Sequence, residues 1–135
     1  MEKNRQTILI IDDNCDVSFM LAVSLRARGF GVLEAENGEI GCELAIMNTP
    51  SLILCDEQMP GLNGVQTLDL LKRTPQTAAI PVLMIGGTGL LNEREWEAHG
   101  ASGFVPKPFE INDLLTVVEN ILLQKTVMPL PPHYR

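Results

Sequence analysis

Short runs of apolar, β-forming residues alternate with stretches of helical periodicity along most of this chain. The predicted strands are residues 7–11, 30–35, 51–55, 80–85 and 102–106. Helices are predicted at residues 15–28, 39–48, 65–73, 92–100 and 110–124, the fourth because Asn92 and Glu95 match a capping box. Five strand–helix units in strict alternation predict a parallel sheet with helices on both faces. The first, third and fourth runs are almost continuously apolar, as expected of central strands covered on both sides.

Composition narrows the class of protein. With 135 residues the chain is long enough for one domain with a buried core. No stretch approaches the roughly 18 apolar residues that span a bilayer, and the N-terminus lacks the features of a secretory signal, so we expect a cytoplasmic protein without a membrane segment. A net charge of −7 argues against direct nucleic-acid binding. The three cysteines are far apart, which favours reduced, mostly buried thiols.

Two further predictions concern the second helix and the C-terminal segment. The residues from 39 to 48 suit a helix that carries Ile40, Leu44 and Met47 on one face. After Lys125 the chain reads TVMPLPPHYR, whose three prolines favour an extended segment. We therefore predict a domain at residues 1–125 and a proline-rich tail or linker at 126–135.

Chemically active side chains follow four of the predicted strands. In an open parallel sheet, ligands bind beyond the carboxyl ends of the strands, so these side chains are expected to converge. The first strand is followed by Asp12 and Asp13, and the third by Asp56, Glu57 and Gln58. The fourth is followed by Gly86, Gly87 and Thr88, and the fifth by Lys107.

Three carboxylates in one crevice repel one another, and a hard divalent cation such as Mg²⁺ relieves that repulsion. With Mg²⁺ the formal charge of the three aspartates changes from −3 to −1, and Lys107 brings it to zero. Such a site suits a phosphoryl group, and Asp56 is the candidate nucleophile because carboxylates form acyl phosphates. Taken singly, the acidic pair can also be a helix N-cap, and Lys107 can be a surface residue in a turn.

The chain from about Thr7 to Gln124 resembles the receiver domain of two-component response regulators. The resemblance rests on ILIIDDN at the first strand, LILCDEQMPGLNG around the third, IPVLMI at the fourth and GASGFVPKPF at the fifth. It implies a flavodoxin-like, doubly wound five-stranded parallel sheet of order 2-1-3-4-5 with five helices.

The resemblance also implies roles for individual residues. Asp56 would be the phosphoacceptor, and Mg²⁺ would be held by Asp12, Asp13, Asp56 and the backbone carbonyl of Gln58. Lys107 would pair with the phosphoryl oxygens and precede a cis peptide bond to Pro108. A histidine kinase or histidine phosphotransfer protein would donate the phosphoryl group, docking near the first helix. A downstream output protein or domain would bind the face built from the fourth helix, fifth strand and fifth helix, for which Trp96 and Phe104 are candidates; partial packing of Trp96 on the sheet is the alternative.

One position departs from the family pattern. The family places Ser or Thr at the end of the fourth strand, where the hydroxyl binds the phosphoryl group, whereas this chain has Gly86 followed by Gly87. The backbone N–H groups of these glycines can bind an anion instead, Thr88 can reach back as a substitute, or nothing replaces the hydroxyl. Phe104 takes the position of the family's switch aromatic.

Competing functions follow from this departure. A phosphorylation-independent receiver that acts as a protein-interaction module is the main alternative, and Gly86 favours it. A Mg²⁺-dependent phosphatase with an aspartyl intermediate is disfavoured because Asn14 stands where a second acid is expected. A flavodoxin is disfavoured because the acidic pair would repel a cofactor phosphate. We therefore expect a self-phosphorylating signalling domain without turnover of a separate substrate.

Overall fold

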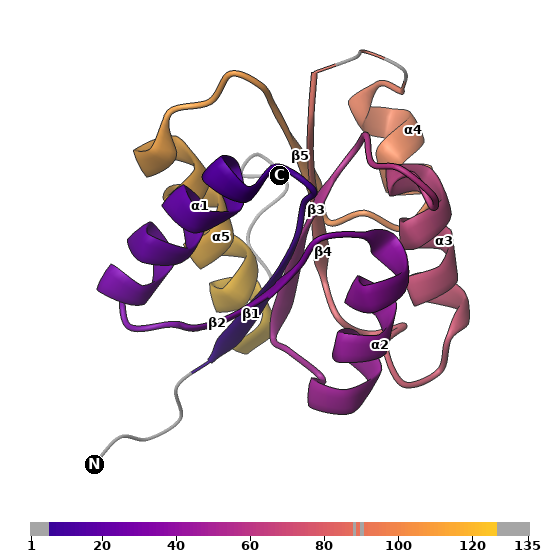
Figure 1. Cartoon of the computed structure of the whole chain (residues 1–135), viewed down its shortest axis with the longest axis horizontal. Helices are drawn as coiled ribbons and strands as arrows, with labels where there is room; N and C mark the ends of the chain where they lie inside the picture. Colours follow the sequence, from indigo (N-terminus) through magenta and orange to yellow (C-terminus); the bar gives the residue numbers. More distant parts are fainter. Residues whose placement is uncertain (1–5, 88, 90, 127–135) are drawn as a thin grey trace.

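The computed structural model of the chain describes residues 6–87, 89 and 91–126 (Figure 1). The described strands are β1 (Thr7–Ile11), β2 (Gly31–Ala35), β3 (Leu52–Asp56), β4 (Val82–Gly86) and β5 (Gly103–Pro106). The described helices are α1 (Cys15–Ala27), α2 (Gly38–Asn48), α3 (Gly64–Arg73), α4 (Glu93–Ala98) and α5 (Ile111–Thr126). The predicted alternation of strands and helices is confirmed, with element boundaries that differ by one or two residues.

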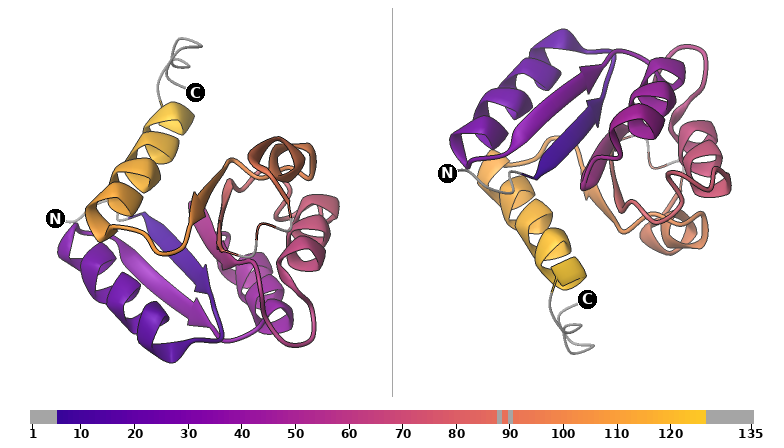
Figure 2. Two further views of the ribbon diagram at one scale, coloured as in Figure 1. Left: turned by 90° about the horizontal axis from the view of Figure 1, so that it is seen from above. Right: turned by 90° about the horizontal axis from the view of Figure 1, so that it is seen from below.

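All five strands are parallel and lie in the order β2-β1-β3-β4-β5, as predicted. Helices α1 and α5 cover one face of the sheet, and α2, α3 and α4 cover the other (Figure 2). Alternate residues of each central strand face the two layers: Leu9 and Ile53 pack toward α2–α4, while Ile8 and Leu54 pack toward α1 and α5. The continuous apolar character of β1, β3 and β4 is thus explained by burial on both faces.

Four of the described helices begin at an asparagine whose side chain accepts hydrogen bonds from backbone N–H groups of the first turn. Asn92 and Glu95 form the predicted capping box at α4, with distances of 2.8 and 2.9 Å. Asn63 and Gln66 form a second one at α3. These caps fix where each helix starts relative to the carboxyl edge of the sheet.

Of the apolar face predicted for α2, only Leu44 packs against the core. Met47 is 77% exposed and Ile40 is 37% exposed, and the helix instead buries its small residues Gly41, Cys42 and Ala45. A Cβ atom on Gly41 would overlap the side chain of Ile11 on β1. The small residues let α2 approach the sheet closely, so burial there follows side-chain size rather than hydrophobicity.

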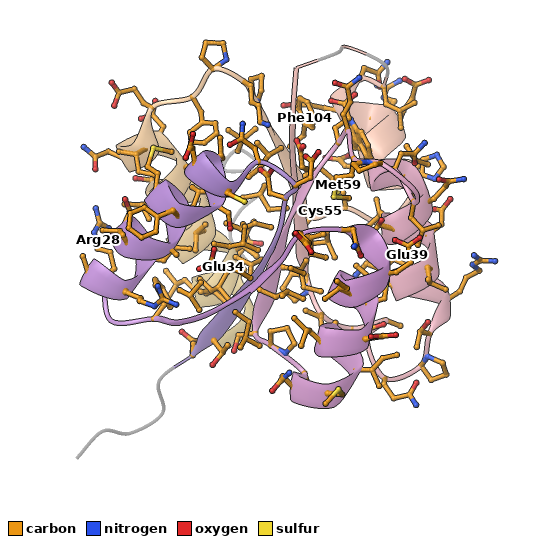
Figure 3. The ribbon with its side chains drawn as sticks, viewed as in Figure 1. Arg28, Glu34, Glu39, Cys55, Met59 and Phe104 are labelled. Atoms are coloured by element: carbon orange, nitrogen blue, oxygen red, sulfur yellow. The ribbon has the colours of Figure 1, made fainter. Side chains whose placement is uncertain are left out.

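Trp96 is completely buried, and its ring stacks on Phe104 of β5 with a centroid separation of 5.9 Å and an interplanar angle of 11°. The prediction that Trp96 lies on a partner-binding surface is therefore wrong, and its alternative, packing on the sheet, is what the structure has. In Figure 3, Phe104 and Met59 lie on the side of the sheet that α3 and α4 cover.

The last described helix runs to Thr126, and the rest of the predicted tail lies outside the described residues. Among the helices described, none combines the length and the apolar character needed to cross a membrane. Cys42 and Cys55 are buried, Cys15 is exposed, and all three are free thiols.

Candidate functional site

The carboxyl ends of the central strands surround a pocket of about 450 Å³. Asp12 and Asp13 follow β1, Asp56 is the last residue of β3, and Lys107 follows β5. Asp56 and Lys107 line the pocket together with Asp13, Asn14, Glu57, Gln58, Met59, Pro60 and Gly86. The predicted convergence of side chains at this edge of the sheet is present in the structure.

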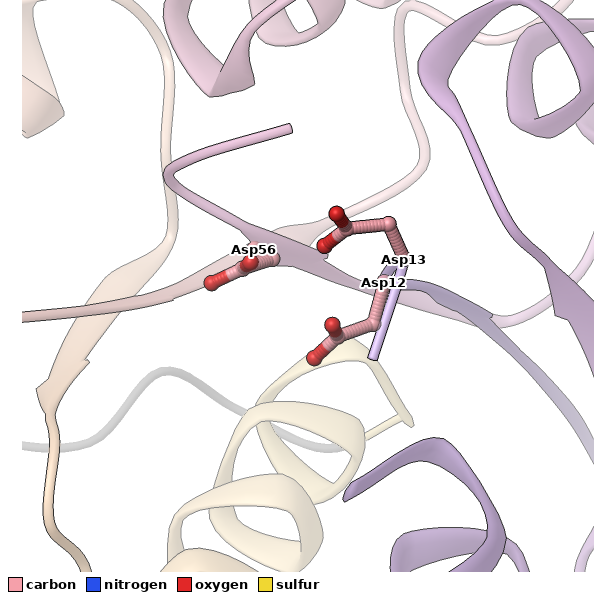
Figure 4. Close-up of side chains that lie close together, drawn as sticks. All are labelled: Asp12, Asp13 and Asp56. Atoms are coloured by element: carbon pink, nitrogen blue, oxygen red, sulfur yellow. The ribbon is translucent and has the colours of Figure 1, made fainter. Parts of the chain in front are cut away.

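Asp12, Asp13 and Asp56 form a cluster in which one carboxylate oxygen from each lies within 4.8 Å of the others (Figure 4). Asp12 and Asp56 are only 4% and 7% exposed, whereas Asp13 is open to solvent. Hard oxygen donors, two buried and one exposed, fit a magnesium ion that keeps several water ligands. Within the part of the chain that the structure describes, these three residues form the cluster that could hold a metal.

Lys107 donates a hydrogen bond from Nζ to Oδ1 of Asp56 at 3.0 Å. Burial raises the pKa of Asp56 above its ordinary value of 3.8, and the hydrogen bond and charge of Lys107 act in the opposite direction. Burial also raises the pKa of Asp12, helped by the neighbouring charge of Asp56 and opposed by a hydrogen bond from the Asn14 backbone N–H. Ionising the Asp12 and Asp56 carboxyl groups in the metal-free site therefore lowers the stability of the folded protein.

This cost gives the metal-free protein a characteristic pH dependence. Because the pKa of Asp12 in the folded protein is above the unfolded value of 3.8, the folded state binds more protons between these two values. The stability that goes with this extra proton binding at Asp12 is therefore fully present below pH 3.8. It is lost as the pH rises through the pKa of Asp12 in the folded protein. An Asp12→Asn variant should be more stable than the parent at neutral pH, and the difference should close as the pH falls below 3.8.

Urea unfolding in the presence of a chelator, repeated across this pH range, measures the effect. The matched control is Glu97→Gln, which removes an exposed charge on α4, away from the cluster, and should not give the gain in stability expected of Asp12→Asn. A lower stability of Asp12→Asn at neutral pH would contradict the electrostatic account of the cluster.

The remaining predicted site residues are distributed around the pocket. Gln58 lies in the pocket wall with an exposed side chain, and the contribution of its carbonyl to metal binding stays a prediction. A Cβ on Gly87 would lie 3.3 Å from the carbonyl oxygen of Lys107, so Gly87 sits beside the β5 end. Thr88 lies outside the described residues. Phe104 is outside the pocket lining, three residues before Lys107, where it pairs with Met84 across the sheet.

The peptide bond between Lys107 and Pro108 is cis, as the resemblance implied. The backbone N–H of Lys107 donates to the carbonyl of Gly86 at 2.7 Å, which joins the ends of β4 and β5. On the other side, the N–H of Gly64 donates to the carbonyl of Glu57 at 2.9 Å. A Cβ on Gly64 would lie 2.7 Å from the Asp56 carbonyl oxygen, so glycine here lets α3 start directly against β3.

Gly86 is a strand residue whose φ is not in the left-handed region, so the fold needs glycine there for space. A Cβ on Gly86 would lie 2.5 Å from the Cβ of Glu57 and would overlap the Glu57 carboxyl oxygen. Glu57 is only 3% exposed, and sequence reasoning assigned it no role. The usable signal was the coincidence of an acid directly after Asp56 with a glycine at the end of β4.

Comparison with known proteins agrees with this geometry. A sequence model of the response regulator receiver domain matches residues 8–119. Protein PilH of Pseudomonas aeruginosa is 35% identical over 85% of this chain and 96% of its own length. The phosphate regulon transcriptional regulatory protein PhoB of the same species is 34% identical over 87% of this chain, which spans about half of that protein (52%).

Solved structures give the same result. The chemotaxis response regulator CheY4 of Vibrio cholerae superposes with a TM-score of 0.81 and 25% identity, over 87% of this chain and 99% of that one. The receiver domain of NtrX from Brucella abortus superposes with a TM-score of 0.78 and 30% identity, over 85% of this chain and 97% of that one. With the family match over most of its length, this chain belongs to the receiver domains of two-component response regulators.

Proposed function

We propose that the chain accepts a phosphoryl group on Asp56 in a Mg²⁺-dependent reaction and passes the signal to an output protein or domain. The observation that carries the proposal is the contact of Lys107 Nζ with Asp56 Oδ1, at 3.0 Å, beside the cluster of three carboxylates. A lysine held against one member of an acidic cluster selects that member as the acceptor, because it favours the ionised form and offers a charge to the incoming phosphoryl oxygens.

In the proposed reaction a carboxylate oxygen of Asp56 attacks the phosphorus of the donor. A bond forms between that oxygen and phosphorus, and the bond from phosphorus to the leaving group breaks, with the electron pair going to the leaving group. Lys107 orients the attacking carboxylate and then pairs with the transferred oxygens. Bound by Asp12, Asp13 and Asp56, magnesium would supply neutralisation of the charge on the transferring group.

The chain acts here as both catalyst and acceptor, so we expect no turnover of a separate substrate. The expected donor is a histidine kinase or a histidine phosphotransfer protein, in the cytoplasm. Support for docking near α1 comes from its exposed apolar side chains: Phe19 is 66% exposed, Val23 49% and Met20 42%. Contiguous exposed apolar side chains are typical of protein-interaction sites.

The first test is intact mass spectrometry after incubation with acetyl phosphate and Mg²⁺. We expect the parent chain to gain one phosphoryl group, and we expect a chelator to prevent the gain because the acidic cluster then repels the donor. If the parent gains nothing although titration calorimetry detects Mg²⁺ binding, the phosphoacceptor proposal fails. The phosphorylation-independent interaction module, which Gly86 favours, would then replace it.

A further inference from the structure

Glu57 lies in the space that a side chain at the end of β4 would occupy. Asp56 pairs with Ile85, and the N–H of Glu57 donates to the Ile85 carbonyl at 2.8 Å, so the hydrogen bonding of β3 to β4 continues one residue beyond Asp56. This extension sets Glu57 directly beside Gly86, on the same face of the sheet. The 2.5 Å separation between a Cβ on Gly86 and the Cβ of Glu57 excludes Ser or Thr at this place while Glu57 keeps its orientation.

The buried carboxyl group of Glu57 therefore stands where a hydroxyl is expected, within the pocket that Asp56 and Lys107 line. The two groups respond to a phosphoryl group in opposite ways. A hydroxyl donates a hydrogen bond to it and is drawn inward. An ionised carboxylate has no proton to donate, and the negative charge of a phosphoryl group repels it.

The charge count in the pocket reinforces this difference. The formal charge of Asp12, Asp13, Asp56 and Glu57 together is −4, of which a magnesium ion and Lys107 offset three. Phosphorylation of Asp56 adds further negative charge beside the buried Glu57. The added charge acts on a side chain that is 3% exposed, where water screens it poorly.

We propose that Glu57 is the positioning residue that replaces the missing hydroxyl: phosphorylation of Asp56 expels its carboxylate from the space over Gly86, and this expulsion carries the signal. The proposal rests on the proposed phosphorylation of Asp56. Glu57 follows Cys55 by two residues and so faces the layer of α2–α4, in which Cys55 and Trp96 are buried. A movement of Glu57 therefore changes the packing on the side of the sheet on which Trp96 stacks against Phe104.

The experiment compares the parent with Glu57→Gln, which keeps the size of the side chain and removes its charge. Glu43→Gln is the matched control, because it removes the same charge from an exposed position on α2. Each chain is incubated with acetyl phosphate and Mg²⁺, and the phosphorylated fraction is followed by intact mass. The emission of Trp96, the one tryptophan in the sequence, reports the change in the α4 layer per phosphorylated molecule.

In Glu57→Gln we expect the phosphorylated state to be favoured by about tenfold, since removal of one like charge at close range is worth about one pKa unit. We also expect the emission change of Trp96 on phosphorylation to be largely lost, because the neutral amide is not expelled. Glu43→Gln should match the parent in both measurements. Equal phosphorylation and equal emission changes in the parent and Glu57→Gln would overturn the proposal while leaving the phosphoacceptor function intact.

A failure of the phosphoacceptor function is distinguishable, because then neither the parent nor Glu57→Gln gains mass, and the inference falls with it. The position of Glu57 has a separate test that needs no phosphorylation. Gly86→Ser should lower the melting temperature in the parent background and should lower it much less in a Glu57→Gly background, which removes the Cβ as well as the carboxyl group. Equal decreases in both backgrounds would overturn the placement of Glu57 over Gly86.

Discussion

Asp56→Asn should take up no phosphoryl group from acetyl phosphate and Mg²⁺, while remaining folded. The amide oxygen has no negative charge with which to attack phosphorus, and the substitution keeps the volume of the side chain. The fold should tolerate the change because burial raises the pKa of Asp56, so the ionised carboxylate already costs stability at neutral pH. In metal-free buffer we therefore expect Asp56→Asn to be at least as stable as the parent.

Intact mass measures the uptake, and urea unfolding in a chelator measures the stability. Asp113→Asn is the matched control, since it removes an exposed aspartate from α5 that does not line the pocket; it should be phosphorylated as the parent is. Asp13 and Glu57 are the two other acids of the pocket lining. Phosphoryl uptake by Asp56→Asn, mapped to either of them by proteolysis, would contradict the assignment of the acceptor to Asp56.

The position of Asp56 at one edge of the sheet could be predicted from sequence, because the residues that follow parallel strands all lie at the carboxyl edge of that sheet. The first strand was predicted at residues 7–11 and is found there, since its continuous apolar run ends abruptly at Asp12. Once five strand–helix units were recognised, Asp12, Asp56 and Lys107 were expected at the same edge of the sheet. The resemblance added the strand order, which alternation alone does not determine.

Two features could not be predicted in this way, because each depends on packing. Helix α2 packs on the sheet through the small residues Gly41 and Ala45 rather than through its large apolar ones. The close approach of Ile11 to Gly41 explains why. Glu57 is the residue after β3, so its direction could be predicted only if the pairing of β3 with β4 were known to continue past Asp56. Its burial follows from the hydrogen bond to Ile85, which sequence patterns do not reveal.

Trp96→Ala should lower the unfolding free energy by about 3–5 kcal/mol, the usual cost of truncating a large buried aromatic side chain. Trp96 is fully buried and is the one residue of α4 that the structure buries. A helix of six residues is too short to be stable by itself in water, so α4 depends on this side chain for its position. We therefore expect hydrogen exchange in α4 to accelerate more than in β1 or β3 when Trp96 is replaced by alanine.

Trp96→Phe is the control that separates ring stacking from the rest of the indole. The indole N–H has no hydrogen-bond partner within the described part of the chain, so its removal relieves an unsatisfied donor and offsets part of the lost volume. Phenylalanine can keep the stacked contact with Phe104, and we expect it to cost less than half as much as alanine. Equal losses in the two variants would mean that the indole as a whole, rather than its stacked ring, holds α4 on the sheet. A loss below about 1 kcal/mol in Trp96→Ala would contradict the burial of Trp96 itself and return it to the partner-binding surface.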